Sequence, residues 1–258
     1  MLAGDRSVDL ADALTLYHDA IAYRVARGSP APLWPRAESC LVLCDLGEWD
    51  ELLAVASFVR DHEDVHGRGQ PGAMTDSCSV LVLSWRGEIE RGAALARELL
   101  PRAREIEDVQ VKGPALVASA LVASARNEAD SALADLEEWD IVTRERPYFR
   151  SMNLTEAVRI ACAAGAIPLG ERLLEGIVTA AERDRLSDLT ARATIAAARG
   201  EDAIAQFAEA AAGWEAFGCR LEHALALRGA GEEAAAAAIL AELGVPPATP
   251  IAASSASG

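Results

Sequence analysis

The chain has 258 residues, of which 40 are acidic and 24 are basic, so its formal net charge is −16. Such a chain repels nucleic acid and anionic membrane surfaces, and its single lysine, Lys112, excludes a polybasic segment. Hydrophobic residues make up 51% of the chain, which excludes a disordered polypeptide, and abundant alanine and leucine with only 5% aromatic residues favour an all-α fold.

Short turns between apolar helices recur along the chain in steps of 31 to 40 residues. Each turn contains a glycine or an asparagine, which is typical of a left-handed residue that ends a helix. A repeat of this length predicts antiparallel helix pairs stacked into an α-solenoid. The turns lie at Gly47, Gly87, Asn127, Gly165, Gly200 and Gly231.

Thirteen helices are expected. The helix after each turn has apolar residues three or four positions apart, which predicts one buried face, whereas the helix before each turn is more uniformly apolar. Residues 1–244 are predicted to form one domain, and the Pro-, Ala- and Ser-containing residues 245–258 a disordered tail. The expected helices are 7–27, 34–46, 48–62, 73–86, 88–107, 113–126, 128–143, 147–164, 166–183, 185–199, 201–217, 219–229 and 231–243.

The beginning of the chain is acidic and has no signal-peptide pattern, and no apolar run reaches the roughly 18 residues of a membrane span. We therefore expect a cytoplasmic protein. Five cysteines lie in apolar helical segments, so we expect free, buried thiols rather than a metal or disulfide framework. They are Cys40, Cys44, Cys78, Cys162 and Cys219.

Two histidines, His62 and His66, lie four residues apart among carboxylates, at the end of the helix expected at 48–62 and just after it. On a helix they share a face and become a zinc site if a third ligand arrives from elsewhere, but a solvated helix end is the favoured interpretation. The following segment, 67–72, is rich in glycine but has neither a preceding strand nor a following Lys-Ser/Thr pair. It is therefore interpreted as a linker and not as a phosphate-binding loop. No metal or cofactor is expected.

The segment 144–150 concentrates arginine with aromatic residues, and we expect part of it to face the concave side of the array. The candidate groove residues for a partner or ligand are Tyr148, Arg150, Asn153 and Arg159. A guanidinium group fits a carboxylate or a phosphate. The alternative is ordinary ion pairing of these arginines with Glu145 and Glu156.

The turn at 47–52 and the turn at 87–92 resemble the turn between the two helices of a tetratricopeptide repeat, although the Trp-Leu-Gly signature of its first helix is absent. The last 120 or so residues are similar to the helical tail of large bacterial signalling ATPases, including those linked to nucleotide cyclases or DNA-binding regulators. The segments that carry this resemblance are 146–151, 156–159, 170–174, 191–193, 200–203, 210–218 and 222–225. No ATPase or cyclase head accompanies them, so the resemblance implies a sensor or scaffold segment.

No convergent set of nucleophile, base or metal ligands is visible, so we expect no enzymatic activity. The favoured function is a protein-interaction or regulatory scaffold that binds a protein partner or a basic peptide segment in its groove, without direct contact to nucleic acid or membrane. The alternative is a sensor domain that binds an anionic metabolite near Tyr148 to Arg159.

Overall fold

The computed structural model describes residues 9–29, 31–67 and 69–247, and all its regular elements in these ranges are helices, which confirms the all-α prediction. No helix in the described ranges is long and apolar enough to cross a membrane. The fourteen helices found there are α1 (Leu10–Ala26), α2 (Leu33–Leu46), α3 (Trp49–His66), α4 (Gln70–Trp85), α5 (Ile89–Glu105), α6 (Val109–Ala125), α7 (Ala129–Thr143), α8 (Pro147–Ser151), α9 (Leu154–Ala163), α10 (Ile167–Leu173), α11 (Glu182–Ala198), α12 (Ile204–Phe217), α13 (Arg220–Gly229) and α14 (Glu233–Glu242).

The six expected turns are confirmed. Their glycines, and Asn127 in the third turn, all have positive φ angles between 61° and 83°. In the first turn, Glu48 N–H donates to the carbonyl oxygen of Leu43 at 3.0 Å, so a left-handed Gly47 lets the chain satisfy the last carbonyl groups of α2.

Enclosed and half-covered helices alternate as expected. Helix α4 packs against α2, α3, α5 and α6, and every residue from Gly72 to Trp85 is buried. Helix α5 instead buries one face, built from Gly92, Ala93 and residues three to four positions further on. This alternation matches the periodicity of the sequence, because a helix covered on several sides has no polar face to solvate.

Two of the expected long helices are interrupted. The segment 147–164 forms the short helix α8 and then α9, with Met152 and Asn153 between them. The segment 166–183 forms only α10, after which the chain turns at Gly176, whose φ angle is 74°.

A buried arginine explains the early end of α10. The guanidinium group of Arg150 donates hydrogen bonds to the carbonyl oxygens of Arg172 and Leu173 at 3.0 and 2.9 Å. These are the last residues of α10, where the carbonyl oxygen of Arg172 also accepts from the N–H of Glu175 at 3.1 Å and that of Leu173 has no partner within the helix. A side chain from α8 thus replaces the next helical turn.

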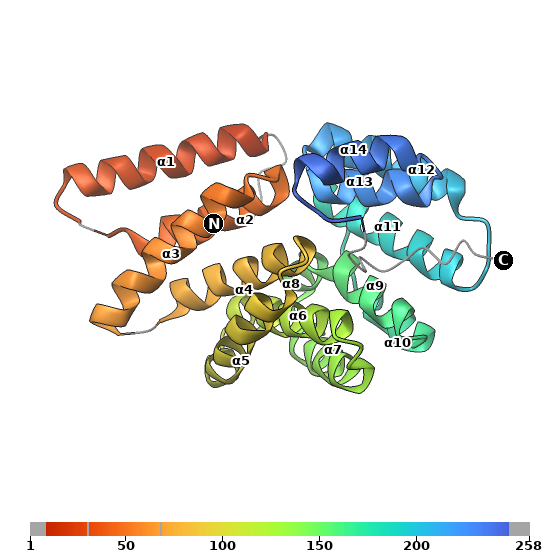
Figure 1. Cartoon of the computed structure of the whole chain (residues 1–258), viewed down its shortest axis with the longest axis horizontal. Helices are drawn as coiled ribbons and strands as arrows, with labels where there is room; N and C mark the ends of the chain where they lie inside the picture. Colours follow the sequence, from red (N-terminus) through yellow and green to blue (C-terminus); the bar gives the residue numbers. More distant parts are fainter. Residues whose placement is uncertain (1–8, 30, 68, 248–258) are drawn as a thin grey trace.

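The helices fan around the centre of the molecule, with α1 to α3 at one end and α12 to α14 at the other (Figure 1). The two ends also touch: α2 contacts α13, Arg86 Nε donates to the carbonyl oxygen of Leu243 at 3.3 Å, and Arg183 of α11 forms an ion pair with Asp45 of α2. An open α-solenoid, in which each helix pair contacts only its sequence neighbours, does not account for these contacts. Burial of apolar surface between the first and last pairs offsets the cost of closing the array.

The chain stays packed slightly beyond the expected domain end. Val245 is buried, and its N–H donates to the carbonyl oxygen of Leu240 at 2.9 Å. Most of the tail expected at 245–258 lies outside the described residues, which end at residue 247.

Candidate functional site

A cavity of about 460 Å³ lies between the two halves of the molecule. It is bounded by α1, α2 and α4 on one side and by α11, α12 and α13 on the other, with α8 and α9 between them (Figure 1). Cavities of roughly 300 to 1,000 Å³ hold small organic ligands in other proteins. The contacts between the first and last helices thus leave a partly open cavity of ligand size between them.

Aromatic and aliphatic side chains form much of the cavity wall. Four of the aromatic residues come from four different helices, namely Tyr17, Trp85, Tyr148 and Phe217. The ring of Trp85 is stacked on Trp49 with 5.5 Å between ring centroids, so its position is set by packing behind the wall. Burial, with a smaller contribution from Glu38, raises the pKa of Tyr17 to about 12. That hydroxyl therefore stays protonated at neutral pH.

A buried ionic network joins α9 to α13 in the same wall. Arg159 of α9 donates to Glu222 of α13 at 2.6 and 2.9 Å and to Oε2 of Glu156 at 3.1 Å. Thr155 Oγ1 donates to Glu222 at 2.8 Å, and Trp85 Nε1 donates to Oε2 of Glu156 at 3.3 Å. Helices from three parts of the chain are therefore linked by charge-assisted hydrogen bonds.

The network keeps its central groups ionised. Burial opposes ionisation of Glu222, but the charge of Arg159 and the hydrogen bonds from Arg159 and Thr155 hold the pKa of Glu222 below its usual value. Burial likewise disfavours the charge of Arg159, yet Glu222 and Glu156 raise the pKa of its guanidinium group. Both shifts have the sign expected of oppositely charged groups in contact.

A second ion pair closes the cavity between α2 and α11. Arg183 of α11 pairs with Asp45 at the end of α2, and Cys219 Sγ lies 3.6 Å from Oδ1 of the same carboxylate. Next to Arg183, the buried Asp184 accepts a hydrogen bond from Ser151 Oγ at 2.5 Å. The ion pair between Arg183 and Asp45 is one of the contacts that hold the first and last helices together.

The structure places the four candidate residues from the sequence in different surroundings. Tyr148 and Asn153 line the cavity, and Arg159 lies in the network just described. Arg150 is 1% exposed, and its guanidinium group donates to Asp140 Oδ1 at 2.6 Å and to the carbonyl oxygens that end α10. The pairing of Arg159 with Glu156 that the sequence also suggested is present.

The histidine pair and the glycine-rich segment are accounted for by local structure. The rings of His62 and His66 lie 4.3 Å apart, but no group of three or more potential metal ligands occurs in the described part of the chain. Between them in sequence, Glu63 accepts hydrogen bonds from the N–H groups of Gly69 and Gly72 at 3.0 and 2.9 Å. A carboxylate of the chain itself therefore occupies the start of α4, where a bound phosphate would need those amides.

All five cysteines are unpaired, and three of them are buried. Burial is the main cause that raises the pKa of Cys40 to about 12 and that of Cys162 to about 11. Burial also raises the pKa of Cys44, Cys78 and Cys219 well above the usual value. Thiolate, the nucleophilic form, is thus suppressed at neutral pH.

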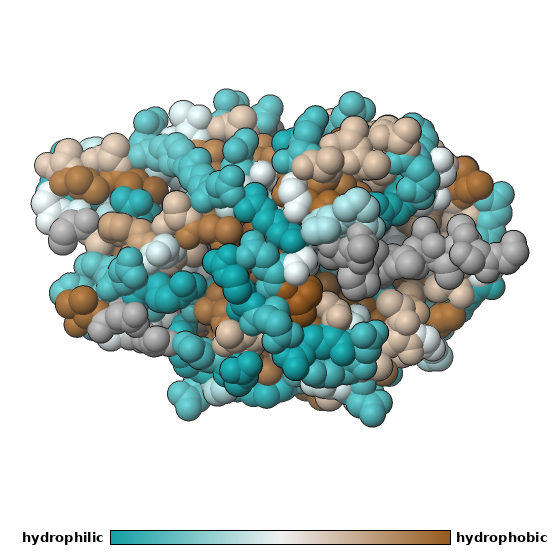
Figure 2. Space-filling model, in the orientation of Figure 1, coloured by the Kyte–Doolittle hydropathy of each residue, from teal (hydrophilic) through white to brown (hydrophobic). Residues whose placement is uncertain are grey.

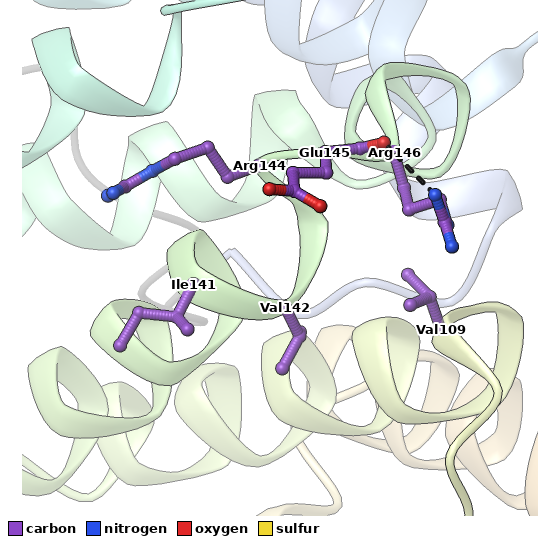
Figure 3. Close-up of a pocket in the computed structure, with 6 residues that line it drawn as sticks. All are labelled: Val109, Ile141, Val142, Arg144, Glu145 and Arg146. Atoms are coloured by element: carbon purple, nitrogen blue, oxygen red, sulfur yellow. Dashed lines mark hydrogen bonds between the residues drawn. The ribbon is translucent and has the colours of Figure 1, made fainter.

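A second, smaller depression of about 290 Å³ lies where α7 leads into α8. Figure 3 shows Arg144 and Arg146 pointing away from each other, with Glu145 between them. Arg144 donates to Asp140 at 2.6 Å, and Arg146 donates to the carbonyl oxygen of Glu145 at 3.5 Å. Their charged groups do not converge on one point, so this depression is the weaker candidate.

Sequence reasoning missed the residues that the cavity wall draws from distant parts of the chain. Trp85 and Glu156 are separated by 71 positions, and Arg159 and Glu222 by 63. Only the Glu156–Arg159 pair has a local signal, namely the three-residue spacing that places two side chains on one helix face.

Comparison of the chain with protein-family models gives no match, and comparisons with curated proteins and with solved structures give none either.

Proposed function

We propose that the chain is a non-enzymatic regulatory module that binds a small organic molecule in its central cavity. The observation that carries this proposal is the cavity of about 460 Å³ with aromatic and aliphatic walls. Pockets of this size and composition, with a few polar groups among apolar ones, are the usual form of small-molecule sites.

The position of the cavity supports a regulatory role. Its wall combines the first helices with the last ones, so a bound molecule contacts both ends of the array at once. A ligand that binds the closed arrangement better than an opened one shifts the population toward closure. Ligand binding then changes the relative position of the two ends of the module. Such a change suits the sensor or scaffold segment of a signalling protein that the sequence resemblance implies.

The proposed scaffold is a tetratricopeptide-like array whose ends have closed on each other. It is supported by the six left-handed turns and by the alternation of enclosed and half-covered helices. We propose no catalytic role, because the ionic groups of the cavity wall are paired with one another.

The proposal is tested by filling the cavity. Ala13 of α1 lines the cavity, whereas Ala11 on the same helix is exposed, so Ala13→Phe and Ala11→Phe form a matched pair. A chemically diverse fragment set is screened by thermal unfolding of the wild type and both variants. Binding to the folded state raises the melting temperature. We expect compounds that stabilise the wild type and Ala11→Phe but leave Ala13→Phe unchanged.

Two results would count against this function. The first is a screen without a single stabilising compound. The second is a set of compounds that stabilise Ala13→Phe as much as Ala11→Phe, since these would bind outside the cavity.

A protein-binding function is the second candidate, because α1 to α3 expose large apolar side chains. Tyr23 is 58% exposed, Phe58 is 40% exposed and Val65 is 76% exposed. Figure 2 shows hydrophobic areas at this end of the molecule among mostly hydrophilic surface. Exposed large apolar side chains are a feature of partner contacts. A partner that binds the wild type and Ala13→Phe equally, but is lost from Tyr23→Ser and Phe58→Ser, would favour this function.

A further inference from the structure

We propose that the molecule bound in the central cavity carries a positive charge, as a protonated amine on an apolar or aromatic body, and that Glu156 is its anchor. This inference rests on the proposed small-molecule function and specifies the ligand class.

The buried charges of the wall do not balance. Four carboxylates that line the cavity are buried or nearly buried, and they are matched by two guanidinium groups, which leaves two negative charges in excess. A buried charge without a partner is costly, so an excess of one sign in a cavity favours a ligand of the opposite sign. The carboxylates belong to Asp45, Glu156, Asp184 and Glu222, and the guanidinium groups to Arg159 and Arg183.

One carboxylate oxygen in the cavity wall carries no hydrogen bond from the described residues. The Glu156 side chain is 8% exposed and lines the cavity, yet the donors Trp85 and Arg159 both reach its Oε2 atom. Both oxygens of Glu222 and both oxygens of Asp184 do accept hydrogen bonds. Oε1 of Glu156 is therefore the acceptor that a donor from the ligand would reach.

The groups around Glu156 favour a cationic ligand over an anionic one. The ring of Trp85 is held beside the carboxylate by its own hydrogen bond, so the edge of the indole meets Glu156 and adds apolar wall next to the charge. Carboxylates at the mouth, Asp9 and Glu182, add negative potential along the entry. An anionic ligand is disfavoured here, because the buried carboxylates outnumber the guanidinium groups, and Arg159 and Arg183 are each bound to a carboxylate through their terminal nitrogens, which leaves only their Nε atoms without a partner.

A metal ion fits this site poorly. In the described part of the chain no three His, Cys, Asp or Glu residues lie close enough to hold one. The single free oxygen of Glu156 matches one ammonium group, and the remaining apolar wall matches an organic body.

The test compares probes that differ only in charge. Three ring systems (phenyl, indolyl and cyclohexyl) are each used as the ethylamine, the ethanol and the acetate, and binding to the full chain is measured by calorimetry at pH 7 and millimolar probe concentration. We expect at least one amine to bind about tenfold tighter than its alcohol, equivalent to about 1.4 kcal/mol, and the acetates to bind weakest.

Two variants locate the charge. Glu156→Gln keeps the shape of the side chain and should remove the preference for amine over alcohol while alcohol binding remains. Glu182→Gln changes a carboxylate at the mouth that is already bonded to Arg185, and should alter the preference less than about threefold. If Glu156→Gln does not fold, as judged by circular dichroism, the wild-type probe series still decides the sign of the charge.

The possible failures are distinguishable. Alcohols or acetates that bind the wild type as tightly as the amines would overturn the positive charge and leave the cavity function standing. An amine preference that survives in a folded Glu156→Gln variant would overturn the anchor. No binding of any of the probes would overturn the cavity function together with this inference.

Discussion

Two buried arginine networks, centred on Arg150 and on Arg159, lie on adjacent short helices and serve different purposes. Around Arg150, three arginines share one carboxylate, Asp140, and the buried guanidinium group also ends α10 by bonding its last carbonyl oxygens. Around Arg159, carboxylates outnumber guanidinium groups, and one carboxylate oxygen faces a cavity without a partner. Similar residues therefore give a joint in which every guanidinium nitrogen of Arg150 is bonded in one place, and a carboxylate oxygen without a hydrogen bond beside a cavity in the other.

The excess charge of each network also has different surroundings. The additional arginines on Asp140, which are Arg144 and Arg172, are 59% and 40% exposed, so their positive charge is solvated. The additional negative charge around Arg159 faces a cavity. Charges in water are screened and interact weakly, whereas charges in a cavity select what enters it.

Removal of the Arg150 guanidinium group should have the largest effect on stability. Arg150→Met leaves Asp140 buried with two partly exposed partners and leaves the end of α10 without the donors of Arg150. Loss of one member of a buried pair costs about 3 to 5 kcal/mol. Urea unfolding followed by circular dichroism measures the difference. The control is Arg144→Met, which removes an exposed partner of the same carboxylate and should cost about 0 to 1 kcal/mol. Equal losses in the two variants would contradict the assignment.

Arg159→Met should destabilise the protein less, by about 2 to 3 kcal/mol, because the carboxylates that lose their partner border a cavity rather than solid protein. The same change should tighten amine binding, because it adds to the negative charge of the wall. The folded fraction of Arg150→Met should bind amines with the affinity of the wild type. Urea unfolding and calorimetry with the amine probes check both parts. Weaker amine binding in Arg159→Met would show that the two networks are not separated in this way.

Acid should weaken both networks. Burial opposes ionisation of Asp140, but hydrogen bonds from Arg150, Arg144 and Arg172 outweigh it and lower the pKa of that carboxyl. The pKa of Glu222 is lowered as well. The unfolded chain therefore takes up these protons at a higher pH than the folded one, so their stabilisation is present above the ordinary values of 4.5 for Glu222 and 3.8 for Asp140 and is lost as pH falls below them.

Urea midpoints measured from about pH 6 down to pH 3 follow this loss. Glu222→Gln should flatten the upper part of the decline, near pH 4.5, relative to Glu233→Gln, whose side chain is 67% exposed. A decline of the same shape in both variants would mean that Glu222 does not contribute.

The smallest effect concerns one threonine in each network. Thr143 Oγ1 lies 3.4 Å from Arg150 and is fully buried, whereas Thr155 Oγ1 donates to Glu222 beside the cavity. Thr155→Val, which removes one hydrogen bond, should cost about 1 kcal/mol, and Thr143→Val, which also removes the 2.7 Å bond from Thr143 Oγ1 to the carbonyl oxygen of Trp139, should cost about 1 to 2 kcal/mol. Calorimetry should show altered amine binding for Thr155→Val alone. A change of amine affinity in Thr143→Val would mean that the first network also reaches the ligand.

Local sequence patterns determined the helical fold and the positions of its turns. The six turns follow from glycine or asparagine at positions where the backbone must be left-handed, and the burial of α4 follows from a segment whose polar residues are small apart from one charged residue, Asp76. These features depend on neighbours within a few residues, which is why periodicity and composition predict them. The early ends of α8 and α10 escaped prediction, because a side chain from elsewhere caps α10.

Only the tertiary structure decided that the array closes on itself and that a cavity results. The contacts responsible join Asp45 to Arg183, Arg86 to Leu243, and Glu222 to Arg159, each pair separated by at least 63 positions in the chain. No spacing rule connects such residues, because their approach depends on how all the helices between them pack. That packing also decided which arginine became a structural joint and which carboxylate was left facing the cavity.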